Sequence, residues 1–584
     1  MFVCLKKFIA AAFMGCVAAA MFWAGVGAPR AAHADEIVNV EYIVGFVKNK
    51  WGVDVPYVPA EIHWAANVEY LLKVVDYVNG KLNNGEKTNY GESEYATKEV
   101  VDTIAANQAI RTLIKKKAPE YKFFFTPAES NGNEFKFWIG AKGTFYIDWD
   151  DGTTKTIEKT EFGLQEISHE YADAAANHTI KLGGTPTEYL TLENMNNDFD
   201  LSAITFINMN TEEASSISSI DGCLGCVFPT LANGAQPIFL YTFAMQEQLK
   251  TLPSTLFDNI HDAGYPYMFG GTFAYSGIRD VPDNLFDGVR IGRKYMFGST
   301  FFGCSDLTSV GDNWFANMER IEPEGGVHVF DGMFEYSGLE TVGDGWFAKL
   351  TNVPEGGWDE SVFYHLFLGA DGLKSVGGNW FGALKTIETR LAFAGMFRRR
   401  EHLESIGDGW FANLETVNGE NVFYEMFYGT SSLKTIPPIF KNIKTGGKDL
   451  FSFTFENSGL TSIPEDMFAG LTQVNDGTFS GTFSGCSGLT SIPEHLFDGI
   501  DTGGSAKTGM FSTTFADCTS LTGPSARING RYLYEIWPDA SSSYGLKLRT
   551  YENATGLSDY ECIPENWGGP GTKNPGECPI PETE

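Results

Sequence analysis

Residues that could carry out chemistry are few and scattered in this chain. Cys223-Leu224-Gly225-Cys226 has the spacing of a redox or metal-binding pair. The sequence contains no second pair of this kind and no histidine pair at zinc spacing, so a structural pair or an ordinary turn is the favoured interpretation. Asp148, Asp150 and Asp151 lack the regular spacing of a calcium loop and are interpreted as a charged turn.

The histidines do not supply a catalytic set either. They are spread along the chain, and the sequence has neither the HExxH motif of zinc proteases nor the GxSxG motif of a nucleophile elbow. Gly446-Gly447-Lys448 lacks the rest of a phosphate-binding loop. We therefore predict no catalytic, cofactor-binding or metal-binding residues and expect that the protein is not an enzyme.

The cysteines after residue 34 raise the question of disulfides. Cys304, Cys486 and Cys518 occupy a slot that Ser, Ala or Thr fills in other repeats, which favours buried thiols acting as small apolar residues. Three pairings stay open from the sequence: Cys223 with Cys226, Cys486 with Cys518, and Cys562 with Cys578.

Four tryptophans recur at one repeat position and could form a sugar-binding stripe: Trp314, Trp346, Trp380 and Trp410. The same position holds Leu256, Leu285 and Leu496 in other repeats. Because interchange with aliphatic residues indicates burial, these tryptophans are predicted to lie in the core.

A binding edge is predicted where the repeats vary most in length and composition. Such insertions project from one side of a repeat protein, and that side commonly carries recognition. The candidate edge is acidic, Gly-rich and aromatic, which suits a basic or glycan partner. Its residues are Glu322, Glu324, Trp358, Asp359 and Glu360. Solvated loops without a ligand are the alternative.

These residues must be positioned by a repeat that fills the C-terminal half of the chain. Ten phenylalanines serve as anchors, spaced 28 to 33 residues apart: Phe243, Phe273, Phe301, Phe334, Phe367, Phe397, Phe427, Phe455, Phe483 and Phe515. In a full-length copy the anchor is followed by a small residue at +3, Leu at +6, Val or Ile at +9, usually Pro or Gly at +10, Trp or Leu at +13 and Phe at +14. Copies with Ser-Gly-Leu, such as the one anchored at Phe455, lack one residue before the Leu, and their later positions are numbered as in the full-length copy. A period of this length predicts a solenoid, in which each turn needs its neighbours to bury its apolar side. We expect one brief strand per turn at the Leu-x-x-Ile segment, for example residues 489–492, ended by Pro493.

The composition and the N-terminal sequence limit the classes of protein to which this chain can belong. The chain has 584 residues and a formal net charge of −32, which argues against nucleic acid or an anionic membrane surface as partner. Lys6 and Lys7 precede an apolar run over residues 8–28, and Ala32-His33-Ala34 supplies a cleavage site. We expect export by a cleaved signal peptide, with an uncleaved anchor as the alternative, and no membrane span in the mature chain.

Two family resemblances follow from the motifs. Trp149-Asp150-Asp151-Gly152 followed by His169-Glu170-Tyr171 resembles the landmarks of PKD-type β-sandwich domains, although Asp150 stands where that family usually has Gly. Gly481-Thr482-Phe483-Ser484-Gly485-Cys486 followed by Leu489 and Ile492-Pro493 is similar to the BspA-like leucine-rich repeat of bacterial surface proteins. The resemblance implies secretion or surface display and, in some members, adhesion to host proteins.

The predicted fold is mostly β and multidomain, with a leucine-rich-repeat-type solenoid of about ten to eleven turns. The predicted segments are a signal peptide (1–34), a helical N-terminal region of unknown role (35–119), a PKD-like β-sandwich (120–190), the solenoid (191–570) and a C-terminal tail (571–584). The predicted function is a secreted or cell-surface binding protein for an extracellular protein or glycan. A periplasmic or envelope scaffold without a host ligand is the alternative. The ligand, the attachment and the oligomeric state are not predicted.

Overall fold

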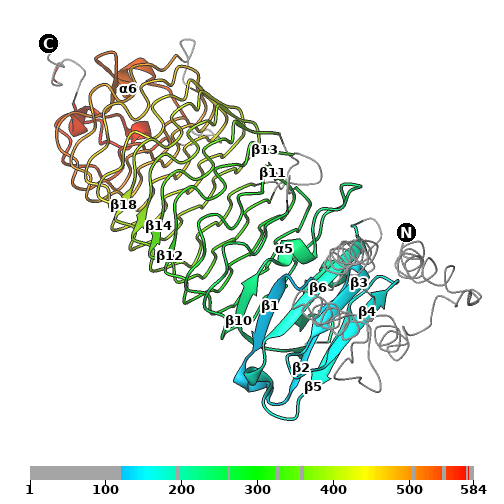
Figure 1. The fold of residues 1–584 in the computed structure, drawn as a ribbon. Helices are drawn as coiled ribbons and strands as arrows, with labels where there is room; N and C mark the ends of the chain where they lie inside the picture. The colour runs from blue at the N-terminus through cyan, green and yellow to red at the C-terminus, as the bar shows by residue number, and fades with distance from the viewer. Residues whose placement is uncertain are drawn as a thin grey trace, which may run out of the picture. The chain divides into compact units, whose positions relative to one another are not determined.

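The computed structural model describes residues 120–192, 198–211, 213–260, 264–322, 328–355, 361–501, 507–541, 547–573 and 577. The predicted signal peptide and the helical region before residue 120 lie outside these residues. Tyr121–Glu584 form one compact unit. Its described residues are mostly β with very little helix: α5 (Leu224–Val227) and α6 (Leu533–Ile536) have four residues each (Figure 1). No helix among the described residues is long and apolar enough to cross a membrane.

The first part of this unit is a pair of antiparallel sheets. One sheet has the strand order β10 (Ile217–Gly222), β1 (Phe123–Pro127), β6 (Ile180–Glu188), β3 (Lys142–Asp148) and β4 (Thr154–Lys159). The other has the order β5 (Gln165–Glu170), β2 (Glu134–Ile139) and β7 (Ile204–Thr205). Three short 3₁₀ helices, Glu129–Asn131, Ala175–Asn177 and Asp198–Leu201, and the hairpin of β8 (Ile207–Asn208) and β9 (Glu213–Ala214) complete this part.

Aromatic side chains join the two sheets. The rings of Phe125 on β1 and Phe137 on β2 lie 5.5 Å apart between centroids, and both are buried. The alternating apolar residues within 135–139, 144–148 and 180–182 lie on β2, β3 and β6. The Asp150-Asp151-Gly152 turn also joins β3 to β4, with Asp150 at a φ of 65°. β7 and β10, which pair with these sheets, come from residues that the sequence assigns to the solenoid.

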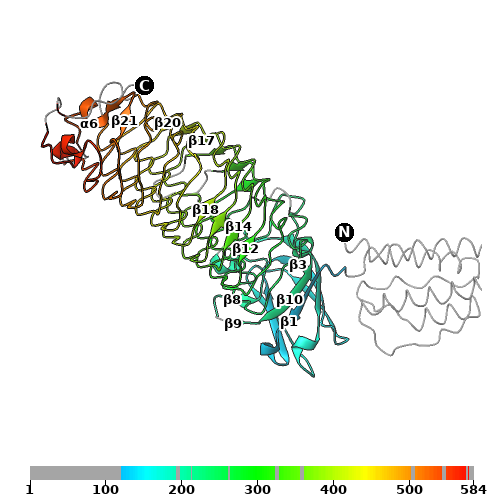
Figure 2. The same ribbon diagram turned by 90° about the vertical axis from the view of Figure 1, so that its left-hand side faces the viewer.

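The rest of the unit is a β-solenoid whose successive turns stack through parallel strands of two residues (Figures 1 and 2). One ladder runs through β12 (Ser309–Val310), β14 (Thr341–Val342), β16 (Ser375–Val376) and β18 (Ser405–Ile406). A second runs through β15 (Asn352–Val353), β17 (Thr386–Ile387), β19 (Thr416–Val417) and β20 (Thr445–Gly446). Short pairs are formed by β11 (Ile291–Gly292) with β13 (Arg320–Ile321), and by β21 (Arg527–Ile528) with β22 (Arg531–Tyr532). The 3₁₀ helices Tyr560–Cys562 and Glu565–Trp567 follow.

The residue after the +9 Val or Ile decides whether the first ladder forms. Where consecutive repeats carry Gly there, the N–H of the later Gly donates to the +9 carbonyl of the preceding turn, as from Gly377 to Val342 (2.8 Å) and from Gly407 to Val376 (2.9 Å). Proline has no N–H to donate. The strand expected over residues 489–492 is therefore wrong as placed: in that repeat, where Pro493 follows Ile492, the described residues form no strand.

Most of the remaining backbone bonds arise in a segment of consecutive tight turns around each anchor. Met333 N–H donates to the Phe330 carbonyl and Ser337 N–H to the Phe334 carbonyl, 3.1 Å each. Gly332 and Tyr336, the third residues of these turns, have positive φ, as type II turns require. The N–H groups of Phe330, Phe334 and Tyr336 instead donate to the following turn. The backbone N–H groups of this segment thus donate alternately within their own tight turn and to the following turn of the solenoid.

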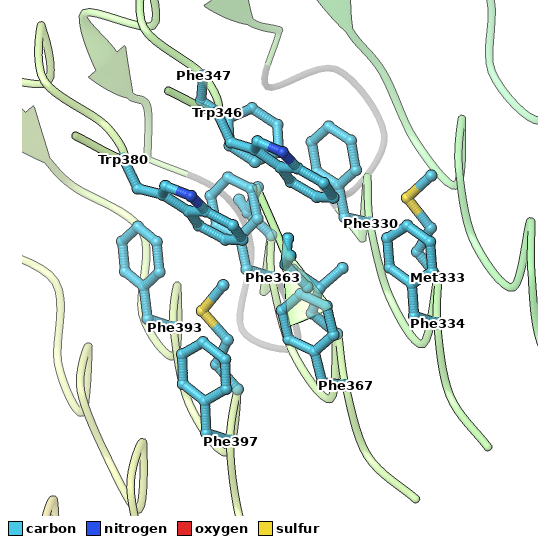
Figure 3. Packing of buried hydrophobic residues seen from close by; sticks show 14 of the residues in the cluster. Phe330, Met333, Phe334, Trp346, Phe347, Phe363, Phe367, Trp380, Phe393 and Phe397 are labelled. Carbon is cyan, nitrogen blue, oxygen red and sulfur yellow. The ribbon is translucent and has the colours of Figure 1, made fainter. Parts of the chain in front are cut away.

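Columns of aromatic rings fill the interior of the solenoid (Figure 3). In the anchor column, Phe334 stacks on Phe367 at 5.7 Å between ring centroids, and Phe367 on Phe397 at 5.3 Å. Parallel columns four residues before and thirteen or fourteen residues after the anchor are equally continuous, as Phe330 with Phe363 (5.2 Å) and Phe347 with Phe381 (5.0 Å) show. All these rings are buried, which confirms that the repeated phenylalanines form the core.

The same core continues into the two sheets. Phe206, beside β7, stacks on the first anchor, Phe243, at 5.5 Å, and Phe123 of β1 lies 6.2 Å from the same ring. At the other end, Phe515 stacks on Tyr551, and Trp567 lies next to Tyr551. Both ends of the anchor column are therefore covered by aromatic residues from outside the ten anchored repeats.

The stacked core predicts a large effect for a single truncation. Phe483 contacts Phe455 and Phe515 at 5.5 Å each, so Phe483→Ala leaves a cavity between two turns. We expect the free energy of unfolding to fall by about 3–5 kcal/mol, measured by urea titration with circular dichroism. Glu465→Gln, at an exposed position, is the control and should leave the midpoint unchanged. Equal midpoints for the two variants would contradict the stacked core.

Candidate ligand-binding surface

An outward-facing column lies two residues after each anchor. The backbone there has positive φ in turn after turn, which aims the side chain away from the core; the first members are Met245, Tyr275, Gly303, Tyr336, Gly369 and Arg399. Met245 is 55% exposed, and Tyr275 and Tyr336 are each 56% exposed. Large exposed apolar side chains at a repeated position of a folded protein are a sign of recognition.

Glycines in alternate turns give the two tyrosines room to lie along the surface. A Cβ on Gly303 would stand 2.6 Å from Cδ1 of Tyr275, and one on Gly369 would stand 2.2 Å from Cδ1 of Tyr336. Both glycines also have positive φ, so two independent requirements select glycine. Each tyrosine thereby lies over the glycine of the next turn.

Phe302 connects the two tyrosines into one patch. Its half-buried ring lies 5.2 Å from Tyr275 and 5.5 Å from Tyr336, edge to face in both cases. We call Tyr275, Phe302 and Tyr336 the aromatic stripe. Further along the same column, exposed Arg399 lies 6.0 Å from the ring of Tyr428. The stripe offers ring surfaces on which an apolar group or the face of a sugar can stack.

An open pocket of about 300 Å³ adjoins the stripe. Three of its lining residues are glycines, which we call the glycine floor, and tyrosines with two carboxylates make up most of the rest. The lining residues are Leu240, Tyr241, Tyr267, Gly270, Tyr295, Gly298, Ser299, Asp331, Gly332 and Glu335. Glu335 of the pocket directly precedes Tyr336 of the aromatic stripe in the sequence, so the two features meet at these residues.

Stacked rings form one wall of this pocket. Tyr267 and Tyr295 stack at 5.5 Å, and His328 stacks on Tyr295 at 5.0 Å with the ring planes 6° apart. His328 Nδ1 lies 3.3 Å from Asp331 Oδ2. Burial, with the nearby Asp331 carboxylate, raises the pKa of Tyr295 and that of Glu335. The pocket therefore combines an aromatic wall with negative charge.

The edge predicted from the sequence is described only in part. Glu322 is 24% exposed and forms ion pairs with Arg293 (2.6 Å) and Arg320 (3.1 Å), so both of its oxygens are engaged. Glu324, Trp358, Asp359 and Glu360 lie outside the described residues. The edge stays a prediction.

The four tryptophans are core residues, as predicted, rather than a sugar-binding stripe. Trp346 and Trp380 are completely buried and stack at 4.7 Å. Their indole N–H groups donate to the Gly311 and Gly343 carbonyls of the preceding turn, at 3.0 and 2.9 Å. Trp410 donates in the same way to Gly377, whereas the indole N–H of Trp314, whose preceding turn carries Pro282, has no hydrogen-bond partner among the described residues.

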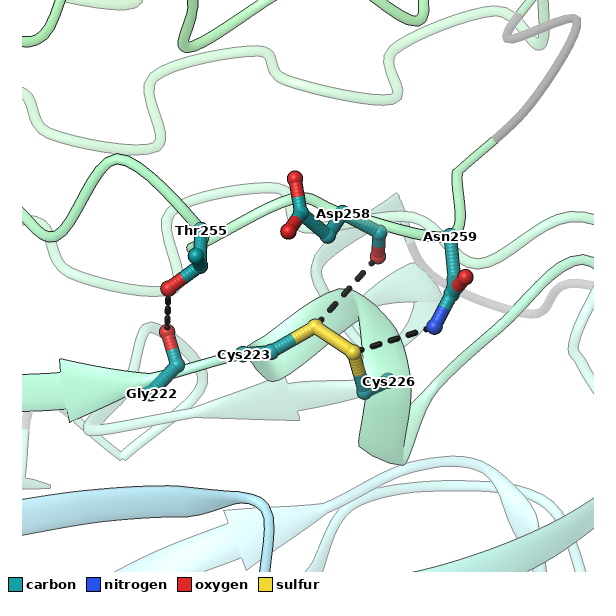
Figure 4. The surroundings of a disulfide bond; sticks show 6 residues. All are labelled: Gly222, Cys223, Cys226, Thr255, Asp258 and Asn259. Atoms are coloured by element: carbon teal, nitrogen blue, oxygen red, sulfur yellow. Dashed lines mark hydrogen bonds between the residues drawn. A yellow bond between two sulfur atoms is a disulfide. The ribbon is translucent and has the colours of Figure 1, made fainter.

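The cysteines are assigned by the structure. Cys223 and Cys226 form a disulfide beside Asp258 and Asn259, which confirms the structural pair (Figure 4). Cys486 and Cys518 are free and buried: their thiols donate to the carbonyls of Phe455 and Phe483, so the pairing left open from the sequence is not formed. Cys562 is disulfide-bonded, and Cys578 lies outside the described residues.

The aspartates of the Asp150 turn already have protein partners. Lys181 Nζ lies 3.0 Å from Asp148 Oδ2 and 3.3 Å from Asp150 Oδ1, and Asp151 Oδ2 lies 2.7 Å from His169 Nε2. Nowhere in the described residues do three or more metal-ligating side chains gather. The turn is a network of ion pairs and hydrogen bonds that joins neighbouring strands.

Comparison with known proteins adds no identification. No protein-family model matches the chain, and a search of curated proteins finds no significant relative. The BspA-like and PKD-like resemblances stay predictions.

The environment of the thiols predicts their reactivity. Burial raises the pKa of Cys304 to about 11 and that of Cys486 to about 12, and it also raises the pKa of Cys518. Since the thiolate is the reactive form, we expect none of the three to react with a thiol reagent at neutral pH in the folded protein, and all three in guanidinium. Mass spectrometry of the labelled protein assigns the sites. Labelling of Cys486 under native conditions, or a Cys486–Cys518 disulfide in a non-reducing digest, would contradict the assignment.

Proposed function

We propose that this chain is an exported, non-catalytic binding protein of a bacterial surface, which holds an extracellular protein or glycan against the aromatic stripe. The observation that carries the proposal is the exposure of Tyr275 and Tyr336 in one column, with Phe302 between them. A soluble domain seldom leaves aligned aromatic rings in water without a partner. The signal sequence in residues 1–34 supports export.

The number of solenoid turns, the PKD-like sandwich and the family of the repeat are part of the same proposal. A solenoid of about ten to eleven turns is supported by the unbroken ring contacts that begin at Phe243 and end at Tyr551. A PKD-like sandwich over residues 120–190 is supported by the facing sheets and by the stacking of Trp149 on His169 at 4.7 Å. Membership of the BspA-like family is supported by the repeat motif. The helical region over residues 35–119 remains part of the proposal from its sequence pattern.

The stripe and the loop edge are two places where the ligand could dock. Rings that lie along the surface present a firm platform, whereas Glu322 already has two arginine partners. The platform therefore accounts better for tight binding, since preorganised aromatic side chains lose little entropy on binding. Glu324, Trp358, Asp359 and Glu360 are kept as the second docking place.

The test begins with a screen of purified residues 35–584 against extracellular matrix proteins and glycans. For the ligand found, Tyr275→Ala/Tyr336→Ala should weaken binding by about tenfold or more, or about 1.4 kcal/mol, without lowering the melting temperature. Asn457→Ala/Asp517→Ala is the matched control, because both residues occupy the same column with positive φ. Binding is measured by surface plasmon resonance.

Two outcomes would overturn the stripe as the docking place. One is unchanged affinity in the tyrosine variant. The other is loss of affinity only in Trp358→Ala/Asp359→Ala/Glu360→Ala, which would assign the ligand to the loop edge. Protection of the protein behind an intact outer layer of the native cell would favour the envelope-scaffold alternative instead.

A further inference from the structure

Among the described residues, neither carboxylate of the pocket has a lysine or arginine partner. Glu335 forms no ion pair with any described residue, and the partner that the structure gives Asp331 is His328, at 3.3 Å. Burial and the Asp331 charge raise the pKa of Glu335, so the two acids repel each other in a partly desolvated place. Two other half-buried acids of this solenoid are paired, Glu425 with Arg398 at 2.5 Å and Glu322 with two arginines, whereas Glu456, like Glu335, forms no ion pair among the described residues.

The shape of the pocket admits a slender group. Gly270, Gly298 and Gly332 leave the floor free of side chains. A Cβ on Gly332 would lie 2.7 Å from Glu335 Oε2, so glycine is what allows the carboxylate to extend over the floor. Tyr267 and Tyr295 also line the pocket, and the apolar parts of their stacked rings can pack on methylene groups. An aliphatic chain that ends in a charged head fits this combination of walls.

From the paired carboxylates, the tyrosine wall and the glycine floor, we propose that this pocket receives a lysine side chain of a basic protein partner. The ammonium lies between Asp331 and Glu335 and relieves their repulsion, while the methylene stem packs on Tyr295. The inference rests on the proposed binding function and deepens it, because the neighbouring Tyr336 receives an apolar side chain of the same partner segment.

Charge over the whole chain supports a basic partner. A net charge of −32 attracts cationic proteins and accelerates their association. A neutral glycan could stack on the tyrosine rings and donate hydrogen bonds from its hydroxyl groups to Asp331 and Glu335. It would leave the repulsion between Asp331 and Glu335 in place, whereas an ammonium removes it.

The probe is hexalysine with blocked termini, titrated into residues 35–584 by isothermal calorimetry at low salt. Asp331→Asn/Glu335→Gln removes both pocket charges with little change of shape. Glu404→Gln/Glu465→Gln is the matched control, because it removes two charges at exposed positions away from the pocket. We expect the pocket variant to bind about tenfold more weakly than wild type and the control within about twofold of it.

Every other result overturns the inference. If both double variants lose affinity equally, the field of the acidic surface holds the peptide and the pocket has no part in it. If wild type does not bind the peptide, or if the pocket variant binds it like wild type, no lysine site exists there. Melting curves of the two variants must coincide with that of wild type, and Asp331→Asn alone serves as the test if the double variant is unstable.

The two levels of the proposal fail separately. If the pocket variant keeps its affinity for the ligand from the screen while Tyr275→Ala/Tyr336→Ala loses it, the binding function stands and the lysine site falls. If neither variant affects that ligand, the stripe falls as well, whatever hexalysine does.

Discussion

Stacking of aromatic rings between turns is the interaction on which the solenoid depends. The strands are only two residues long, and in the described residues several repeats have none, so strand ladders alone do not hold the turns together. Rings repeat at about the spacing of neighbouring backbones, between 4.7 and 5.7 Å in the central turns, and each buried ring contacts rings in the turns before and after it. Such rings bury large apolar areas and prefer defined geometries, so they fix the register between turns as well as the stability.

A second constraint explains why the repeats are not identical. Where consecutive repeats carry Gly at +10, the N–H of the later Gly completes the strand ladder, as from Gly377 to Val342, and the carbonyl of the earlier Gly accepts the indole N–H of the next turn, as Gly343 does from Trp380. Where Pro stands there, no such N–H exists, and the +13 position holds an aliphatic residue such as Leu496. Gly with Trp and Pro with an aliphatic residue are thus two matched solutions for one core. The tight turns around the anchor recur in both kinds of repeat, while the residue two positions after the anchor differs from one turn to the next.

Much of the core could be predicted from the sequence, because a buried column demands the same residue type at the same position in every turn. The position of Trp346 holds leucine in other repeats, and this too indicated that the side chain at this position is buried. The outer column could not be predicted as a binding surface, since it shows in the sequence only as a mixture of Gly, Tyr, Arg and Asn. What the members of the column share is a backbone with positive φ. Glycine and asparagine favour this conformation, so Gly303, Gly369 and Asn457 were a signal in the sequence that sequence reasoning missed. The pocket brings together residues from several turns, such as Tyr295 and Glu335, whose proximity follows from the turn geometry and not from a motif.

Hydrogen exchange of the native protein tests the central claim most directly, since it reads the bonds between turns one segment at a time. If stacked neighbours hold each turn, the amides around Phe334 and Phe397, which donate to the following turn, exchange slowest and share one opening free energy close to that of global unfolding. The backbone of residues 568–573, which follows the last ring of the column at Trp567, should exchange first. Rapid and independent exchange of the segments around Phe334 and Phe397 would contradict the account, because it would mean that the turns open without their neighbours.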